Sequence, residues 1–240
     1  MIKPIMFPHT FDSTMLGAFR SCPQKMFRTY VEHWKPKSES VHLVAGGAFA
    51  RGIEVARKAF YEERMSEADA VATGLEALLV AYGDFETPPD SAKSPTRMAG
   101  ALEFYFENYP LEGASAVPLT FPNGKLAIEF SFAEPLDIMH PVTGDPILYT
   151  GRCDMIADFC GGQYTVDEKT TSQLGASWPK QWEMRSQFTG YQWAANRAGL
   201  NVQGTLVRGV SILKTKYDHL QHVTYRSPYE VNRWLDQTHR

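Results

Sequence analysis

The chain is organised around residues 151–171, which read GRCDMIADFCGGQYTVDEKTT. Two runs of β-forming residues, 147–159 and 163–169, lie on either side of Gly161 and Gly162. Glycine adopts, at little steric cost, the positive φ that a tight hairpin turn requires. The pattern therefore predicts a β-hairpin with this glycine pair at its turn.

Three ionisable side chains converge if the hairpin pairs in ordinary register. Side chains alternate along a strand, so Asp167 and Lys169 share one face while Glu168 points the other way. Asp154 on the first strand then lies near Asp167. Carboxylate oxygens bind Mg²⁺ or Mn²⁺, and a nearby lysine can stabilise charge that develops on a phosphate. The arrangement indicates hydrolysis of phosphodiester bonds, whereas Asp-x-Lys taken alone also fits a surface ion pair.

The order of short motifs along the chain extends this pattern. A Gly-x-x-Asp motif ends at Asp154, and Asp-x-Lys-Thr follows at residues 167–170. Gln187 and Tyr191 then form Gln-x-x-x-Tyr, with both side chains on one face of an expected helix. This order resembles the RecB-like branch of the PD-(D/E)XK nuclease superfamily.

The resemblance covers about residues 13–199. It includes Ser13 and the run SCPQKMFR at residues 21–28, which joins a serine and Cys-Pro to basic and aromatic residues. Some nucleases of this branch hold an iron–sulfur cluster through one early and three late cysteines. The three cysteines here are Cys22, Cys153 and Cys160, so no late set follows and no cluster is expected.

The resemblance implies a role for each matched residue. Asp154 and Asp167 would bind Mg²⁺ or Mn²⁺ together with the main-chain carbonyl of Glu168, and Lys169 would be the catalytic lysine. The other expected site residues are Gln187 and Tyr191 in the catalytic site, and Thr170 and Arg185 as contacts to the substrate.

The chain departs from the branch at one position. The family commonly carries Gly-x-x-x-His on an early helix, with the histidine as a metal ligand, whereas the matching run here ends at Arg51. A guanidinium stays protonated and has no acceptor, so Arg51 cannot bind a metal. Glu54 lies three residues further on nearly the same helical face and is the candidate replacement. Alternatively, Arg51 holds a DNA phosphate and the site uses fewer protein ligands.

Length and composition fit one globular domain. The chain has 240 residues, 43% of them hydrophobic, which is enough for a packed core. We expect a single domain over residues 1–240, with a largely helical lobe over 1–112 and a sheet core over 113–240. Because no run of about 18 apolar residues and no apolar signal-peptide core are present, we expect a cytoplasmic protein that does not enter a membrane.

Charge is distributed unevenly although the net charge is only −3. Residues 1–60 carry nine Lys and Arg against four Asp and Glu, and residues 172–240 carry the same numbers. The segment between them carries six against 19. Two basic flanks around an acidic centre fit a nucleic-acid groove, because local positive potential drives phosphate binding. Solvated helix faces would give the same asymmetry.

Hydrophobic periodicity and capping residues divide the chain into a helical part, a strand-rich part and a mixed part. Helices are expected from Met15, over 23–33, 43–62, 66–82, 94–108 and 179–198, and from Pro228 to the end. Strands are expected over 116–121, 126–132, 147–159, 163–169, 203–214 and 220–225, the first four as an antiparallel meander. Arg20, Lys25 and Arg28 either lie near DNA or form the solvated face of a helix.

These expectations combine into one hypothesis. The fold class is α/β, with a restriction-endonuclease-like mixed sheet flanked by helices and a helical N-terminal lobe. The expected function is Mg²⁺- or Mn²⁺-dependent DNA hydrolysis by a stand-alone or phage-type exonuclease of recombination or repair. The alternatives are a catalytically weak nucleic-acid-binding module of the same fold and a protein that docks onto a recombinase or helicase. Expected partners are DNA and a recombination protein such as an annealing protein or helicase, and a homo-oligomer is compatible with the resemblance.

Overall fold

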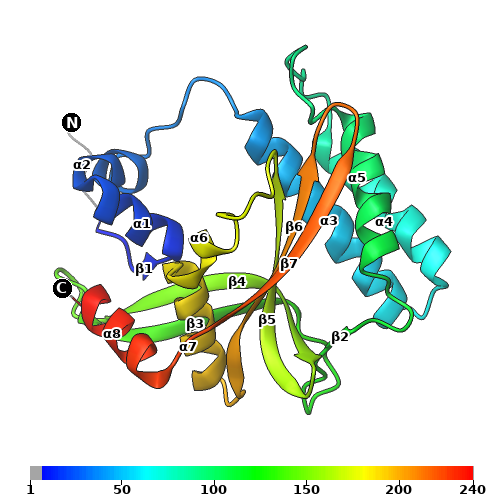
Figure 1. The fold of residues 1–240 in the computed structure, drawn as a ribbon. Coiled ribbons are helices and arrows are strands. Elements are labelled where there is room, and N and C mark those ends of the chain that lie inside the picture. Colours follow the sequence, from blue (N-terminus) through cyan, green and yellow to red (C-terminus); the bar gives the residue numbers. More distant parts are fainter. Residues whose placement is uncertain (1–6, 240) are drawn as a thin grey trace.

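The computed structural model describes residues 7–239 as an α/β fold in which helices flank a mixed seven-stranded sheet (Figure 1). The N-terminal residues used to argue against a signal peptide, and Arg240 at the expected end of the last helix, lie outside this range. The helices are α1 (Ser13–Ser21), α2 (Pro23–Met26), α3 (Val41–Tyr61), α4 (Glu67–Tyr82), α5 (Pro95–Asn108), α6 (Lys180–Glu183), α7 (Ser186–Arg197) and α8 (Pro228–Thr238), with a π-turn at Phe27–Val31. The strands are β1 (Thr10–Phe11), β2 (Ala116–Pro118), β3 (Ile128–Met139), β4 (Pro146–Phe159), β5 (Gly162–Thr171), β6 (Val202–Ile212) and β7 (Tyr217–Tyr225).

The predicted hairpin is the centre of the sheet. Strands β4 and β5 pair antiparallel, and the sheet order is β1-β4-β5-β6-β7. The turn differs by one residue from the prediction, because Cys160 and Gly161 form it with φ of 49° and 80°, while Gly162 is the first residue of β5. A two-residue turn with both φ values positive matches the twist of the flanking strands, which favours Cys160-Gly161 as the turn.

The expected four-stranded meander is only partly correct. Strand β3 pairs antiparallel with β4, but β2 also pairs with β4 rather than with β3. One isolated bridge, between Thr120 and Leu126, joins the segments that the prediction placed in a hairpin. Strand β4 is 14 residues long, so its edge accommodates both β2 and β3 one after the other.

Two predicted helices are interrupted. The helix expected over 179–198 breaks at Met184 and Arg185, and Arg185 is extended with ψ of 112°. The helix expected over 23–33 gives way to the π-turn after Met26, and His33 adopts a φ of 59°. The helical spacing of apolar residues continues across both breaks. This spacing is a property of the sequence, so it does not reveal where the backbone changes direction.

The helices before residue 112 form two groups on different sides of the sheet (Figure 1). Helices α3, α4 and α5 share one hydrophobic core with Val210 and Ile212 of β6. Helix α1 instead packs with α7 and α8 in a second core around Tyr149 and Ile147 of β4. Parallel pairing of β5 with β6 requires a crossover, and α6 and α7 supply it.

Helix α7 lies close against β4 because Gly190 has no side chain. A Cβ atom at this position would overlap the Tyr149 hydroxyl group. The close approach fixes the part of α7 that carries Gln187 and Tyr191 beside the central hairpin. Within residues 7–239, no helix is both long enough and apolar enough to cross a membrane.

Candidate active site

The hairpin places two carboxylates side by side where β4 and β5 stop pairing. Met155 and Val166 are the last partners of the ladder at this end, and Asp154 and Asp167 are the next residues on the two strands. The backbone N–H of Glu168 is no longer used by β4, and it donates a hydrogen bond of 3.0 Å to Asp154 Oδ2. Where the ladder ends, the Asp154 carboxylate is thus fixed against the backbone of β5, next to Asp167.

Lys169 contacts the second carboxylate. Its Nζ lies 2.5 Å from Oδ2 of Asp167, which is only 2% exposed. The Lys169 ammonium is thus the direct charge partner of this buried oxygen. An ionised carboxylate has about four lone-pair sites, so Asp167 keeps capacity for a further positive partner.

Burial and mutual repulsion dominate the electrostatics of this cluster. Burial, followed by the charges of Asp167 and Glu168, raises the pKa of Asp154 well above its usual range. Burial also raises the pKa of Asp167, against the opposing charge of Lys169. For Lys169, burial acts to lower the pKa, but the charges of Asp167 and Asp154 outweigh it and the pKa is raised. The lysine therefore stays protonated, and the two carboxylates together still attract positive charge.

These residues face a cleft of about 410 Å³ between β4, β5, α3 and α7. Strand β5 also contributes Thr170, whose hydroxyl accepts a hydrogen bond of 3.1 Å from Lys93 Nζ. The remaining wall residues are His42, Gly46, Phe49 and Ala50 of α3, Arg152 of β4, and Gln187 and Tyr191 of α7. Asp154, Asp167, Glu168, Lys169, Thr170, Gln187 and Tyr191, all expected from the sequence, thus line one cleft.

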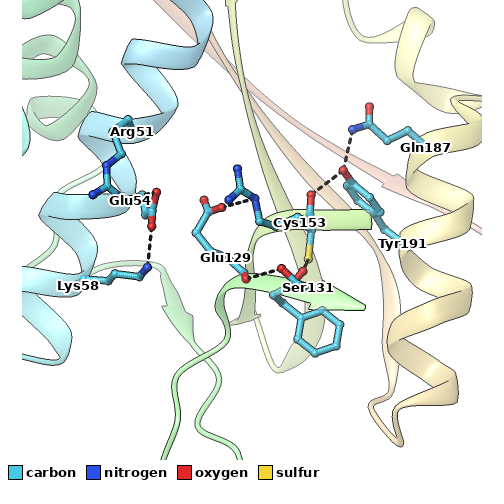
Figure 2. Close-up of polar contacts among 10 residues, drawn as sticks. Arg51, Glu54, Lys58, Glu129, Ser131, Cys153, Gln187 and Tyr191 are labelled. Carbon is cyan, nitrogen blue, oxygen red and sulfur yellow. Dashed lines mark hydrogen bonds and ion pairs between the residues drawn. The ribbon is translucent and has the colours of Figure 1, made fainter. Parts of the chain in front are cut away.

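Helix α7 contacts the hairpin through a short hydrogen-bond chain (Figure 2). Gln187 Nε2 donates to the Tyr191 hydroxyl at 2.8 Å, and that hydroxyl donates to the Arg152 carbonyl at 2.8 Å. Burial and the charge of Asp167 raise the pKa of Tyr191, so the phenol keeps its proton. Tyr191 therefore positions α7 against β4, and Gln187 is oriented at the cleft wall.

The side chain of Glu168 points to the opposite face, as strand alternation predicts. Its carboxylate contacts Arg57 of α3 and accepts a hydrogen bond of 2.9 Å from the Tyr105 hydroxyl. Burial acts to raise the pKa of Glu168, but the Arg57 guanidinium lowers it to about 2. Arg57 and Tyr105 therefore hold the Glu168 carboxylate toward α3 and α5.

Glu54 and Arg51 do not line the cleft. Glu54 pairs with Arg51 at 2.9 Å and with Lys58 at 2.6 Å along one side of α3 (Figure 2). Residues 42, 46 and 50 line the cleft and recur every four positions, so Glu54 continues this face of α3 one turn beyond the cleft. Arg51 and Lys58 hold Glu54 there, while α3 presents His42, Gly46, Phe49 and Ala50 to the cleft.

Arg185 lies in a neighbouring cavity and not in the cleft itself. It is the last extended residue before α7, and its positive charge acts on Asp167 from there. His42, Phe49, Ala50 and Arg152 line the cleft without having been predicted. The four-residue spacing of His42, Gly46 and Ala50 was present in the sequence, but it does not show which helical face meets a sheet.

The donor set suits a hard divalent cation. Within residues 7–239 no three His, Cys, Asp or Glu side chains gather in a way that could hold a metal ion. Two carboxylates, Asp154 and Asp167, and the carbonyl of Glu168 are nevertheless a fitting set for Mg²⁺, which keeps several waters and needs only one or two protein carboxylates. Both carboxylates line one cleft, and a carboxylate beside a single ammonium keeps lone pairs for a cation, which supports this fit.

Comparison with known proteins adds little to this geometry. No protein-family model and no curated protein sequence matches the chain. The crystal structure of SSO0001 is similar over 93% of this chain and 82% of that chain, at 14% sequence identity and a TM-score of 0.33. A similarity this low does not establish a shared fold.

Asp154→Asn should stabilise the metal-free protein. The folded state raises the pKa of Asp154, so stability from this group is full at low pH and is lost as the pH rises toward the folded-state pKa. Asparagine removes that loss and still accepts the Glu168 hydrogen bond. We expect the free energy of unfolding in EDTA at pH 8 to rise by about 1 kcal/mol.

Urea denaturation across pH measures this difference, which should vanish near about pH 3, where the aspartate is protonated in both states. Asp158→Asn is the matched control, because Asp158 is exposed on the same strand. Equal stability changes in the two variants at pH 8 would contradict the prediction.

Proposed function

We propose that the protein is a metal-dependent DNA nuclease of the PD-(D/E)XK superfamily, in its RecB-like branch, with a restriction-endonuclease-like core. The observation that carries the proposal is the convergence of Asp154, Asp167 and Lys169 in one cleft. Residues from two strands form it, and both carboxylates are held before any ligand binds. An Asp-x-Lys motif that formed only a surface ion pair would not bury Asp167 beside a second carboxylate.

Asp154, Asp167 and the Glu168 carbonyl would hold Mg²⁺ or Mn²⁺. Such a cation lowers the pKa of a bound water and offsets the charge of a phosphodiester. The chain's own contribution is positioning. Asp167 holds the Lys169 ammonium at the cleft wall, where it can donate to an oxygen of the scissile phosphate. Gln187 and Thr170 offer further donors along the same wall.

An exonuclease role in recombination or repair follows from the resemblance and is part of the proposal. DNA is the proposed substrate, and an annealing protein or helicase is the proposed class of partner. Arg51 and Glu54 lie outside the cleft and pair with each other, which argues against Glu54 as the replacement for the metal-binding histidine and against Arg51 as a phosphate contact in the cleft.

The test is cleavage of end-labelled linear DNA. The purified protein is incubated with single- and double-stranded substrates in Mg²⁺, Mn²⁺ or EDTA, beside Asp154→Asn and the control Asp158→Asn. We expect cleavage that requires the metal, disappears in Asp154→Asn and persists in Asp158→Asn. Release of mononucleotides from one labelled end would identify an exonuclease and its polarity.

Binding without cleavage in either metal would refute the nuclease. It would favour the second candidate, a catalytically weak nucleic-acid-binding module, for which the supporting observation is that no third metal-binding side chain gathers with Asp154 and Asp167 within residues 7–239. Failure to bind DNA at any salt concentration would exclude both functions.

A further inference from the structure

Two further cavities continue the active-site cleft along the molecule. The first, of about 620 Å³, adjoins the cleft at Gln187, which lines both. The second, of about 610 Å³, adjoins the first at Arg20, Met184 and Ser186, which also line both. From the central hairpin, the cavities pass between α1 and the α6–α7 segment and reach α8. These helices lie next to one another in Figure 1. We call these two further cavities the basic groove.

Positive side chains dominate the walls of the basic groove. They are Arg20, Lys25, Lys180, Arg185, Arg226 and Arg233. In the part of the chain that the structure describes, none of them forms an ion pair. The one carboxylate on these walls, Glu230, accepts hydrogen bonds from the backbone and hydroxyl of Ser227 at the start of α8. Uncompensated positive charge in a concave surface focuses potential that attracts phosphates.

The placement of these cations sets them apart from other charged residues. Elsewhere within residues 7–239, some cations are paired, such as Arg152 with Glu129 and Arg197 with Glu134, and others, such as Lys125 and Lys214, are exposed without an ion pair. The six positive side chains of the groove instead gather on the walls of two adjoining cavities that carry a single carboxylate.

Helix α8 presents a regular stripe to the far end of the groove. Tyr229, Arg233 and Gln237 follow one another at four-residue spacing, and all three line the same cavity. The Tyr229 side chain is 71% exposed, and Met184 across the cavity is 74% exposed. An aromatic ring beside a cation is a platform on which a nucleic-acid base stacks while its phosphate is bound.

This chemistry fits an unpaired strand better than a duplex. In a duplex the base faces are stacked on each other, so the exposed Tyr229 and Met184 would find few base faces to contact. In a single strand each base has a free face, and stacking on aromatic side chains is tolerant of sequence. We propose that the basic groove binds single-stranded DNA and leads it into the cleft of Asp154 and Lys169. This inference rests on the proposed function for the chemistry at the end of the path.

Arg20 joins the two cavities and also holds the fold together. It donates to Ser186 Oγ at 2.8 Å and to Thr238 Oγ1 at 3.4 Å, linking α1 to α7 and α8. Arg226 is buried and donates its hydrogen bonds to neutral acceptors, among them the Trp182 carbonyl. Substitution of either arginine would disturb folding, so the exposed residues Tyr229 and Arg233 are the ones to vary.

The experiment measures binding by fluorescence anisotropy with wild-type protein in EDTA, which withholds the cation. The probes are thymidine oligonucleotides of about 4 and about 12 nucleotides, within the range of single-strand site sizes, and a duplex of the longer length. The variants are Tyr229→Ala, Tyr229→Phe and Arg233→Ala. Lys214→Ala, on the exposed turn between β6 and β7, removes a charge far from α8 (Figure 1).

We expect Tyr229→Ala to raise Kd for the longer single strand about tenfold, and Tyr229→Phe to preserve it, because the phenyl ring still stacks. Arg233→Ala should reduce the slope of log K against log salt by about 0.7. The shorter strand, which fills only the cleft, should bind all variants alike. Lys214→Ala should bind both strands as wild type does.

If Tyr229→Ala and Arg233→Ala bind the longer strand unchanged and the wild-type protein cleaves DNA with metal, the groove would be overturned. The proposed nuclease function would stand. If those variants lose binding and the wild-type protein never cleaves DNA, the groove would be supported and the nuclease function refuted. Equal losses for duplex and single strand would overturn the assignment to an unpaired strand.

Discussion

Lys169→Ala should lower the rate of metal-dependent DNA cleavage by about 10²–10³-fold, the usual effect of removing one donor that stabilises developing charge. The Lys169 ammonium is already held by Asp167 in the free protein, so its removal costs transition-state stabilisation more than substrate binding. We therefore expect kcat to fall and KM to change by about threefold at most. Single-turnover cleavage of labelled DNA measures both values.

Lys125→Ala is the charge-matched control, since Lys125 is exposed on the turn before β3. Lys169→Arg should not restore activity, because a planar guanidinium cannot replace a compact ammonium at a fixed position. Circular dichroism shows whether each variant is folded. Cleavage by folded Lys169→Ala at more than about a tenth of the wild-type rate would remove Lys169 from the catalytic site.

Arg57→Met should destabilise the fold by about 3–5 kcal/mol, because it leaves the Glu168 carboxylate buried without its charge partner. The Tyr105 hydroxyl would be the main remaining donor to that carboxylate. Combining Arg57→Met with Glu168→Gln should recover most of the loss, since the uncompensated charge is then gone. Urea denaturation of the two single variants and the double variant measures the coupling.

Arg51→Met is the matched control on the same helix. Arg51 is half exposed and pairs with Glu54 at the surface, so its loss should cost about 1 kcal/mol or less. Similar losses in Arg57→Met and Arg51→Met would mean that the Arg57–Glu168 pair does not anchor α3 to β5. Additive losses in the double variant would mean the same.

Much of the central sheet and cleft could be predicted from local pattern. The alternation of Asp167, Glu168 and Lys169 predicted their faces correctly, and Asp154 lies where hairpin register places it. The four-residue spacing of Gln187 and Tyr191 predicted that both would face the hairpin. In each case the prediction needs only the side-chain repeat of one helix or strand, or of two strands joined by a short turn.

The errors arose where segments distant in sequence compete for the same place. Strand β2 pairs with β4 instead of with its neighbour β3, because the long β4 offers it an edge. The break between α6 and α7 at Arg185 leaves periodicity intact, so a helical pattern does not reveal it. Glu54 was chosen as a ligand from spacing along α3, but it lies one turn beyond Ala50, outside the cleft, where it pairs with Arg51 and Lys58.

The sequence by itself determined the hairpin, the faces of its side chains and the strand-rich character of the chain's second half. The tertiary structure alone decided which side of α3 meets the carboxylates, which cation neutralises Glu168 and which helices border the basic groove. The Arg57–Glu168 contact joins residues 111 positions apart, so no local period encodes it. Such contacts depend on how whole helices bury their apolar faces against the sheet, and that packing is a property of all the elements together.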